Sequence, residues 1–204
     1  MGLLSSTVSI TRYKVEGKLE EPVLETIGKC LKHNAIPEID DDISEKTVGW
    51  TSFDHPFRPD FEGSSFVIGR YLVFSMRIDK KTIPSKIIKK HYAIEMAKRL
   101  AETGRHYLSR DEKSAIKEHV TSVLSLRIPA TPNIYDLIWN YEDSSLWFFS
   151  NLKSANEELE TLFSRSFKLA LIRLFPYTTA ALVVDLSDTE RDILVKLSRT
   201  NFTE

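Results

Sequence analysis

The chain has one cysteine, no long apolar run and none of the common nucleotide-binding or acyl-transfer motifs. Because Cys30 stands alone, an internal disulfide framework is excluded and a reducing compartment is favoured, with the cytoplasm as the default expectation. The longest apolar run, residues 180–184, is far shorter than the roughly 20 residues of a membrane helix. Glycine-rich phosphate loops and a nucleophile elbow are both missing, so the sequence gives no support to a nucleotide cradle or an acyl-transfer nucleophile.

The sequence also lacks a recognisable set of metal ligands. Cys30 and His33 form an isolated C-x-x-H, and the other histidines do not supply the second pair that a zinc site needs. Cys30 falls on the apolar side of a predicted helix, so we interpret it as a small core residue. The sequence therefore predicts neither a metal site nor a cofactor.

What remains is the composition of a soluble globular protein. The 204 residues are 42% hydrophobic and 28% charged, with a formal net charge of −1. A chain of this length can bury roughly 70% of its unfolded surface, which is enough for a core without covalent staples. Composition alone points to no particular function.

The charges are sorted along the chain. Lysine and arginine outnumber acids over residues 80–118, whereas acids outnumber bases over residues 16–62. A field with opposite poles favours docking onto a polyanion or onto an oppositely charged protein surface. The ordinary alternative is a pair of solvated helix faces, because basic patches are weak motifs.

Hydrophobic periodicity and turn residues predict an α+β fold in which amphipathic helices cover antiparallel hairpins or sheets. Strands are expected at residues 8–15, 48–51, 167–175 and 182–184, and hairpins at residues 65–78 and 134–149. Helices are expected at residues 22–34 and 85–102, and after capping boxes that begin at Ser109, Ser154 and Ser187. Gly104 is expected to end the helix that precedes the first of these boxes.

The expected elements suggest three segments that pack as one continuous unit. Residues 1–79 form an N-terminal α+β part with the helix at 22–34 and the hairpin at 65–78. Residues 80–128 form a basic helical pair, and residues 129–204 hold the second hairpin with further helices.

Both helices of the basic pair are expected to be amphipathic. The first should bury a broad apolar face, with His91 and Glu95 opposite it and with Glu95 paired to Lys98 and Arg99. That apolar face comprises Ile87, Tyr92, Ala93, Ile94, Met96, Ala97, Leu100 and Ala101. The second helix should bury Ile116, Val120, Val123 and Leu124, which leaves Arg110, Lys113 and Lys117 toward water.

Two other interpretations of individual residues remain open at this stage. Asp60 and the run 111–113 could supply carboxylates and a lysine for metal-dependent phosphodiester cleavage, although acids in a first helical turn are already favoured by the macrodipole. The tryptophans Trp50, Trp139 and Trp147 could stack on bases, but their alternating strands favour a core role. Phe57 and Tyr107 lie in polar surroundings and are the better stacking candidates.

Several strings in a fixed order resemble the bacterial recombination-associated RdgC family. They include residues 48–50, Ile83-Pro84-Ser85, Gly104-Arg105 and the hairpin residues 137–149. The resemblance covers the chain to about residue 176, so the chain is similar to a short form that lacks the usual C-terminal part. Members of that family bind DNA without known sequence preference, form ring-like dimers around the duplex and restrain the RecA recombinase.

The resemblance implies a non-catalytic DNA-binding protein associated with recombination. It implies a homodimer in the cytoplasm and nucleoid, with double-stranded DNA as the partner and an indirect relation to a RecA-type recombinase. The expected phosphate contacts are Lys86, Lys89, Lys90, Lys98, Arg105, Arg110, Lys113 and Lys117. The shorter C-terminal part leads us to expect that one of the two ring-closing contacts is absent.

Two rival functions remain. The basic helices could meet an acidic protein partner, such as residues 16–62 of a second copy. The third hypothesis is a metal-dependent nuclease.

Overall fold

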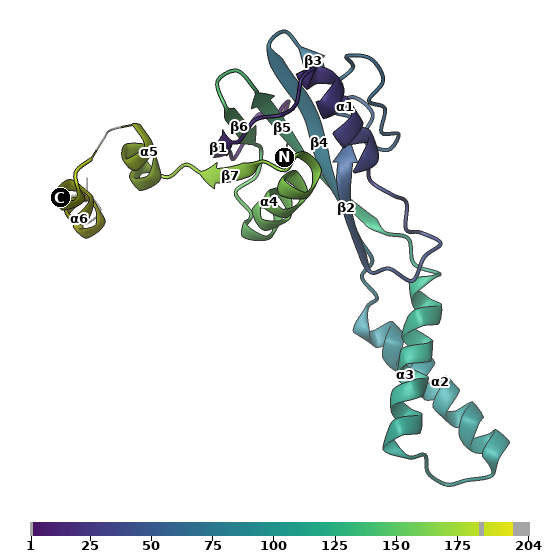
Figure 1. The fold of residues 1–204 in the computed structure, drawn as a ribbon. Coiled ribbons are helices and arrows are strands. Elements are labelled where there is room, and N and C mark those ends of the chain that lie inside the picture. The colour runs from purple at the N-terminus through teal and green to yellow at the C-terminus, as the bar shows by residue number, and fades with distance from the viewer. Residues whose placement is uncertain (1, 184–185, 198–204) are drawn as a thin grey trace. The chain divides into compact units, whose positions relative to one another are not determined.

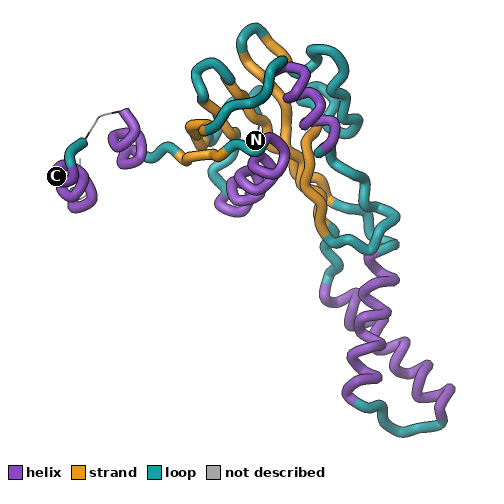
Figure 2. Tube along the Cα trace, in the orientation of Figure 1, coloured by secondary structure: helices purple, strands orange, loops and turns teal. Residues whose placement is uncertain are grey.

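The computed structural model describes residues 2–183 and 186–197, and it has the predicted α+β fold (Figures 1 and 2). The strands over these residues are β1 (Thr11–Glu16), β2 (Lys46–Thr51), β3 (Val67–Ile68), β4 (Tyr71–Lys80), β5 (Thr131–Asn140), β6 (Ser145–Phe148) and β7 (Ala170–Arg173). The helices are α1 (Val23–His33), α2 (Ser85–Thr103), α3 (Arg110–Ser125), α4 (Lys153–Phe167), α5 (Pro176–Val183) and α6 (Asp188–Lys196).

The strands are joined in the order β2-β4-β5-β6-β1-β7, with β3 paired to β4 off that path. The pairs β1–β6, β1–β7, β2–β4, β3–β4 and β5–β6 are all antiparallel. Both predicted hairpins are confirmed, since β3 turns into β4 at Gly69 and β5 pairs with β6. Gly69 has φ 61°, a left-handed conformation that glycine adopts without strain because it has no Cβ.

The chain forms two compact units. One consists of Met1–Ile27, Phe66–Val73 and Asp136–Glu204, and the other consists of Gly28–Ser65 and Phe74–Tyr135. Both α2 and α3 belong to the second unit, where they are joined to the ends of β4 and β5 (Figure 1). The three-segment organisation expected from the sequence stays a prediction.

An aromatic cluster forms the core of the first unit. Trp139 on β5 packs edge-on against Phe163 of α4, with 5.0 Å between ring centroids, and also contacts Phe167. All three side chains are buried, as are Tyr13 and Phe148 on the neighbouring strands. The core role predicted for Trp139 is confirmed, whereas Trp147, on the other face of β6, is 44% exposed.

The core of the second unit is built on β2 and β4. Trp50 is fully buried and meets Phe74 edge-on, with ring centroids 5.2 Å apart. The segment after α1 lies against β2, because Ile36 N–H donates to Trp50 O and Trp50 N–H donates to Asn34 O, both at 2.9 Å. Trp50 is therefore a core residue, as its strand pattern predicted.

Two sequence predictions about the C-terminal elements are wrong. The box at Ser154 does not form, because α4 begins at Lys153 with Leu152 as its N-cap and no side-chain cap. The side-chain amide of Asn156 instead donates to Leu152 O at 2.8 Å, and the helix starts two residues earlier than the box required. Residues 182–183 lie in α5 rather than in a strand, and residue 184 lies outside the described residues.

The start of α5 explains that second error. Pro176 supplies the fixed φ of a first helical position, and the hydroxyl of Thr178 accepts a hydrogen bond from Phe175 N–H at 2.6 Å. A helix that starts at Pro176 continues through residues 182–183, which the sequence pattern had suggested for a strand. Strand β7 is correspondingly short, since α4 runs to Phe167 before it.

No helix among the described residues meets the length and apolarity needed to cross a bilayer.

Candidate nucleic-acid interface

Helices α2 and α3 pack side by side through a narrow apolar seam. On the α3 side the buried residues are Leu108, Ile116, Val120 and Leu124, and the α2 residues against them are Ile88, Tyr92, Met96 and Leu100. The stripe predicted for α3 is confirmed, with Val123 half-buried at its edge. Gly104 ends α2 in the left-handed conformation, as predicted.

The apolar face predicted for α2 was too broad. Ile94 is 55% exposed and Ile87 is also exposed, because a single neighbouring helix covers only one stripe. His91 and Glu95, which we expected opposite the apolar face, instead line crevices against α3. Among the described residues no ion pair joins Glu95 to Lys98 or Arg99, so those predicted pairs do not form.

One flank of the helical pair carries charges of both signs. A cavity of about 380 Å³ there is lined by Glu95 and Arg99 from α2 and by Glu112 and His119 from α3. A second cavity of about 190 Å³ shares Glu95 and His119 and adds His91. We call this flank, defined by His91, Glu95, Arg99, Glu112 and His119, the mixed side.

The opposite flank is basic. With 100° per residue, Lys86 and Lys89 fall across the seam of α2 from Glu95. In the same way, Arg110, Lys113 and Lys117 fall across the seam of α3 from Glu112 and His119. Because the mixed residues of both helices line one cavity, the flanks opposite them also face one way. We call the five residues Lys86, Lys89, Arg110, Lys113 and Lys117 the cationic side.

All eight cations predicted as phosphate contacts are exposed, but the structure brings only five together. At 100° per residue Lys90 lies about 140° from the mean direction of the α2 seam residues, compared with about 100° for Lys86, so Lys90 points away from α3. Lys98 follows Glu95 by three residues and lies at the outer edge of the mixed side. Arg105, between the helices, is paired with Glu112 at 3.2 Å.

The cationic side is extended along the pair. The helices are antiparallel, since Thr103 shares a cavity with Glu112 while His91 shares one with Leu124. Lys86 therefore lies at one end of the flank and Arg110 near the other. At 1.5 Å per residue the five cations span about 24 Å, which corresponds to about seven base-pair steps of B-DNA.

Within the described residues none of the five cations of this flank is in an ion pair. Glu112, the neighbour of Lys113, is engaged elsewhere: it accepts from Ser109 N–H at 2.8 Å while Ser109 Oγ accepts from Glu112 N–H at 3.2 Å. These hydrogen bonds, with Arg105 close by, hold the pKa of Glu112 below its ordinary value. The predicted capping box is confirmed. Glu45 and Glu118 border the flank where they line a cavity with Lys117.

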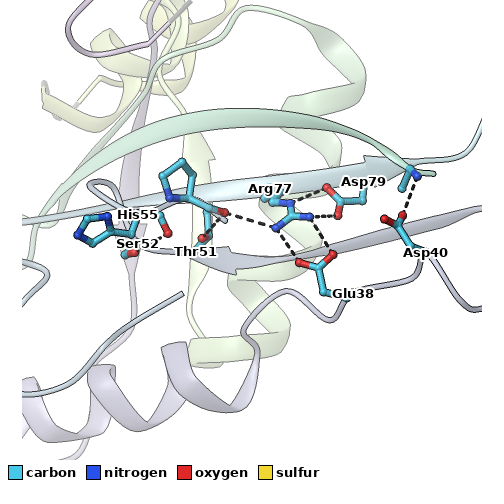
Figure 3. Close-up of polar contacts among 9 residues, drawn as sticks. Glu38, Asp40, Thr51, Ser52, His55, Arg77 and Asp79 are labelled. Carbon is cyan, nitrogen blue, oxygen red and sulfur yellow. Dashed lines mark hydrogen bonds and ion pairs between the residues drawn. The ribbon is translucent and has the colours of Figure 1, made fainter. Parts of the chain in front are cut away.

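Within the second unit, Glu38 of the acid-rich residues 16–62 forms an ion pair with a buried arginine. Arg77, buried on β4, donates from Nε to Asp79 Oδ1 at 2.7 Å and from Nη1 to Glu38 Oε1 at 3.1 Å (Figure 3). Burial alone would lower the pKa of Arg77, but the two carboxylates outweigh it and the pKa lies above its ordinary value. This cluster was not predicted from the sequence, although an arginine and an aspartate two positions apart on an apolar strand are a signal for it.

The loop that follows β2 is held by the same cluster. Pro56 O accepts from Thr51 Oγ1 at 2.8 Å and from Arg77 Nη1 at 3.5 Å, and His55 O accepts from Ser52 Oγ (Figure 3). Phe57 is 59% exposed, and the Arg77 guanidinium lies 5.4 Å from its ring centroid. Phe57 and Tyr107 are exposed as expected, and a stacking role for them stays a prediction.

Two of the three acids considered for a nuclease site, Asp60 and Glu112, have local partners. Asp60 Oδ1 accepts from Glu62 N–H at 2.9 Å, and Glu112 belongs to the capping box. No group of three or more His, Cys, Asp or Glu side chains that could hold a metal ion occurs within the described part of the chain.

The fold and this surface define an α+β protein that presents a basic helical hairpin to solvent. A family model described as "Putative exonuclease, RdgC" matches residues 9–170, which is most of the chain. The chain therefore belongs to the RdgC family, and the resemblance found in the sequence is confirmed. A search of curated proteins finds no match. Membership of this family supports a recombination-associated role in general.

Proposed function

We propose that this protein is a non-catalytic factor in recombination that binds duplex DNA without sequence preference, through its phosphate backbone. The observation that carries the proposal is the cationic side of the α2–α3 pair, where five exposed bases lie together. It functions as a homodimer in the cytoplasm, associated with the nucleoid, and affects a RecA-type recombinase only indirectly by occupying DNA.

Phosphates suit this surface better than base edges. Four of the five groups are lysines, which are flexible point charges rather than the planar forks that read guanine bidentately. Their spread along about 24 Å matches a run of backbone rather than a single base pair. Such contacts supply affinity and register but no sequence code.

The test is fluorescence anisotropy of a labelled duplex across a salt series. Five phosphate contacts on one protomer should give a log–log slope of about −4.5, or about −9 if both protomers contact the duplex, so affinity should fall by at least about 500-fold between 50 and 200 mM salt. Duplexes of unrelated sequence should bind within about threefold of one another, because backbone contacts are the same for all. Absence of binding at low salt would refute the proposal and favour an acidic protein partner instead.

The family description raises the nuclease alternative directly. Plasmid and linear duplex incubated with magnesium or manganese should remain intact if the protein is non-catalytic. Cleavage that depends on the added metal and is abolished by Asp111→Ala would replace the proposal with the nuclease hypothesis. The homodimer is tested separately by sedimentation equilibrium, where a monomer at micromolar concentration would contradict it.

A further inference from the structure

Not every lysine of the basic stretch faces solvent. Lys81, the residue after β4, is 5% exposed. Its ammonium donates to three backbone carbonyls: Asp40 O at 2.9 Å, Asp42 O at 2.6 Å and Ser125 O at 2.8 Å. An ammonium has three N–H donors, so all of them are satisfied by these acceptors.

The third acceptor ties Lys81 to the helical pair. Ser125 is the last residue of α3, and the final carbonyls of a helix have no partner within it. A cation at a helix C-terminus is also favoured by the macrodipole. Lys81 therefore caps α3 from a position that lies four residues before the start of α2.

The same loop holds the other connections of the pair. Lys81 N–H donates to Glu45 O at 2.8 Å. Asp40 Oδ1 accepts from Ala130 N–H, after α3, at 2.8 Å (Figure 3, at the label Asp40). The chain leading into α2 and the chain leaving α3 are thus both fastened to residues 40–45. We call these residues the collar.

A buried ammonium is costly unless each of its hydrogen bonds is made. Here removal of the ammonium would leave three carbonyls without their donor, two in the collar and one at the end of α3. All three hydrogen bonds require both the collar and the end of α3 to lie against this ammonium. That requirement fixes the end of α3 relative to the collar, and so fixes the direction in which the pair leaves β4 and β5.

We propose that Lys81 is a positioning residue that sets the direction of the α2–α3 pair and thereby presents its cationic side to DNA. The consequence for DNA rests on the proposed function, whereas the positioning itself does not. Lys81 contributes no phosphate contact, because its ammonium is enclosed by the collar and α3.

The test compares Lys81→Met with Lys80→Met, which removes the same charge from the exposed neighbouring position. Spin labels at Asp54→Cys and Ser114→Cys, in a Cys30→Ser background, report the distance between the loop after β2 and α3. Lys81→Met should broaden or shift this distance distribution, and Lys80→Met should leave it unchanged. An unchanged distribution in Lys81→Met would overturn the proposal.

Duplex affinity of the same variants separates positioning from contact. Lys81→Met should bind at least fivefold more weakly at low salt with the wild-type salt slope, since no phosphate contact is removed. A salt slope lower by about one would show a direct phosphate contact of Lys81 and overturn the proposal. A broadened spin-label distance distribution with unchanged duplex affinity would also overturn it. If the wild type binds no duplex, the proposed function fails, while the distance measurement still decides the positioning role.

A second variant covers the case in which Lys81→Met does not fold. Asp40→Ala removes the acceptor of Ala130 N–H from an exposed position and leaves the Lys81 hydrogen bonds to backbone oxygens in place. It should broaden the same distance distribution to a smaller extent. An unchanged distribution in Asp40→Ala would overturn the role of the collar.

Discussion

Arg77 and Asp79 lie two positions apart on β4, on the same face of the strand, and are joined through Arg77 Nε and Asp79 Oδ1 at 2.7 Å. Both are buried, with 5% and 1% of their surface exposed. Arg77→Met would leave the buried Asp79 carboxylate without its charged partner. We expect the free energy of unfolding to fall by about 3–5 kcal/mol in urea titrations.

The matched control replaces both partners. Arg77→Met combined with Asp79→Leu removes the buried charges together, and the double variant should recover much of the lost stability. A loss below about 1 kcal/mol in Arg77→Met would show that the pair is not desolvated as its burial indicates.

Gly49 on β2 is required by the close approach of another segment. A Cβ at this position would lie 2.5 Å from Ile36 Cα and 2.6 Å from Ile36 N, both backbone atoms. The hydrogen bonds between Trp50 and residues 34 and 36 hold that segment in place. We expect Gly49→Ala to cost about 3 kcal/mol, measured by chemical denaturation.

Gly104→Ala is the comparison for that variant. Gly104 has φ 62° and open space around it. Alanine at this position should therefore lower the free energy of unfolding by only about 1 kcal/mol, the cost of a left-handed backbone conformation for a residue with a side chain. Equal losses at the two positions would contradict the crowding at Gly49.

Glu112 should make the stability of α3 depend on pH. Its pKa in the folded protein lies below the ordinary value of 4.5, because it accepts from Ser109 and lies near Arg105. The stabilisation is therefore complete above that ordinary value and is lost as the pH falls through the folded pKa. Unfolding free energies of the wild type and Glu112→Gln should differ by a constant amount from pH 7 to about pH 5 and converge at lower pH. A difference that grows toward low pH would have the wrong sign.

Local signals in the sequence predicted much of the fold. The capping box at Ser109, the glycine at 104 and the hairpin turn at Gly69 act through neighbouring residues, so they hold in the structure. The box at Ser154 failed because Asn156 offers a competing hydrogen bond to Leu152 O. Residues 182–183 were assigned to a strand because the helix start at Pro176 and Thr178 was not recognised.

The candidate surface was predictable only in part. Helical periodicity places each cation on its own helix, but the flank shared by α2 and α3 depends on how the two helices pack. For that reason Lys98 and Lys113 were both predicted as phosphate contacts, although they lie on different flanks. The burial of Lys81 depends on a loop about 40 residues earlier, which no local pattern reveals.

The measurement that tests this account most directly is the salt dependence of duplex binding for Lys113→Gln beside Lys98→Gln. Each variant removes one exposed lysine from the helical pair, but only Lys113 lies on the cationic side. We expect Lys113→Gln to reduce the slope by about 0.9 for each protomer that contacts the duplex, and Lys98→Gln to leave it at the wild-type value. Equal changes in both variants, or a change in Lys98→Gln alone, would contradict it.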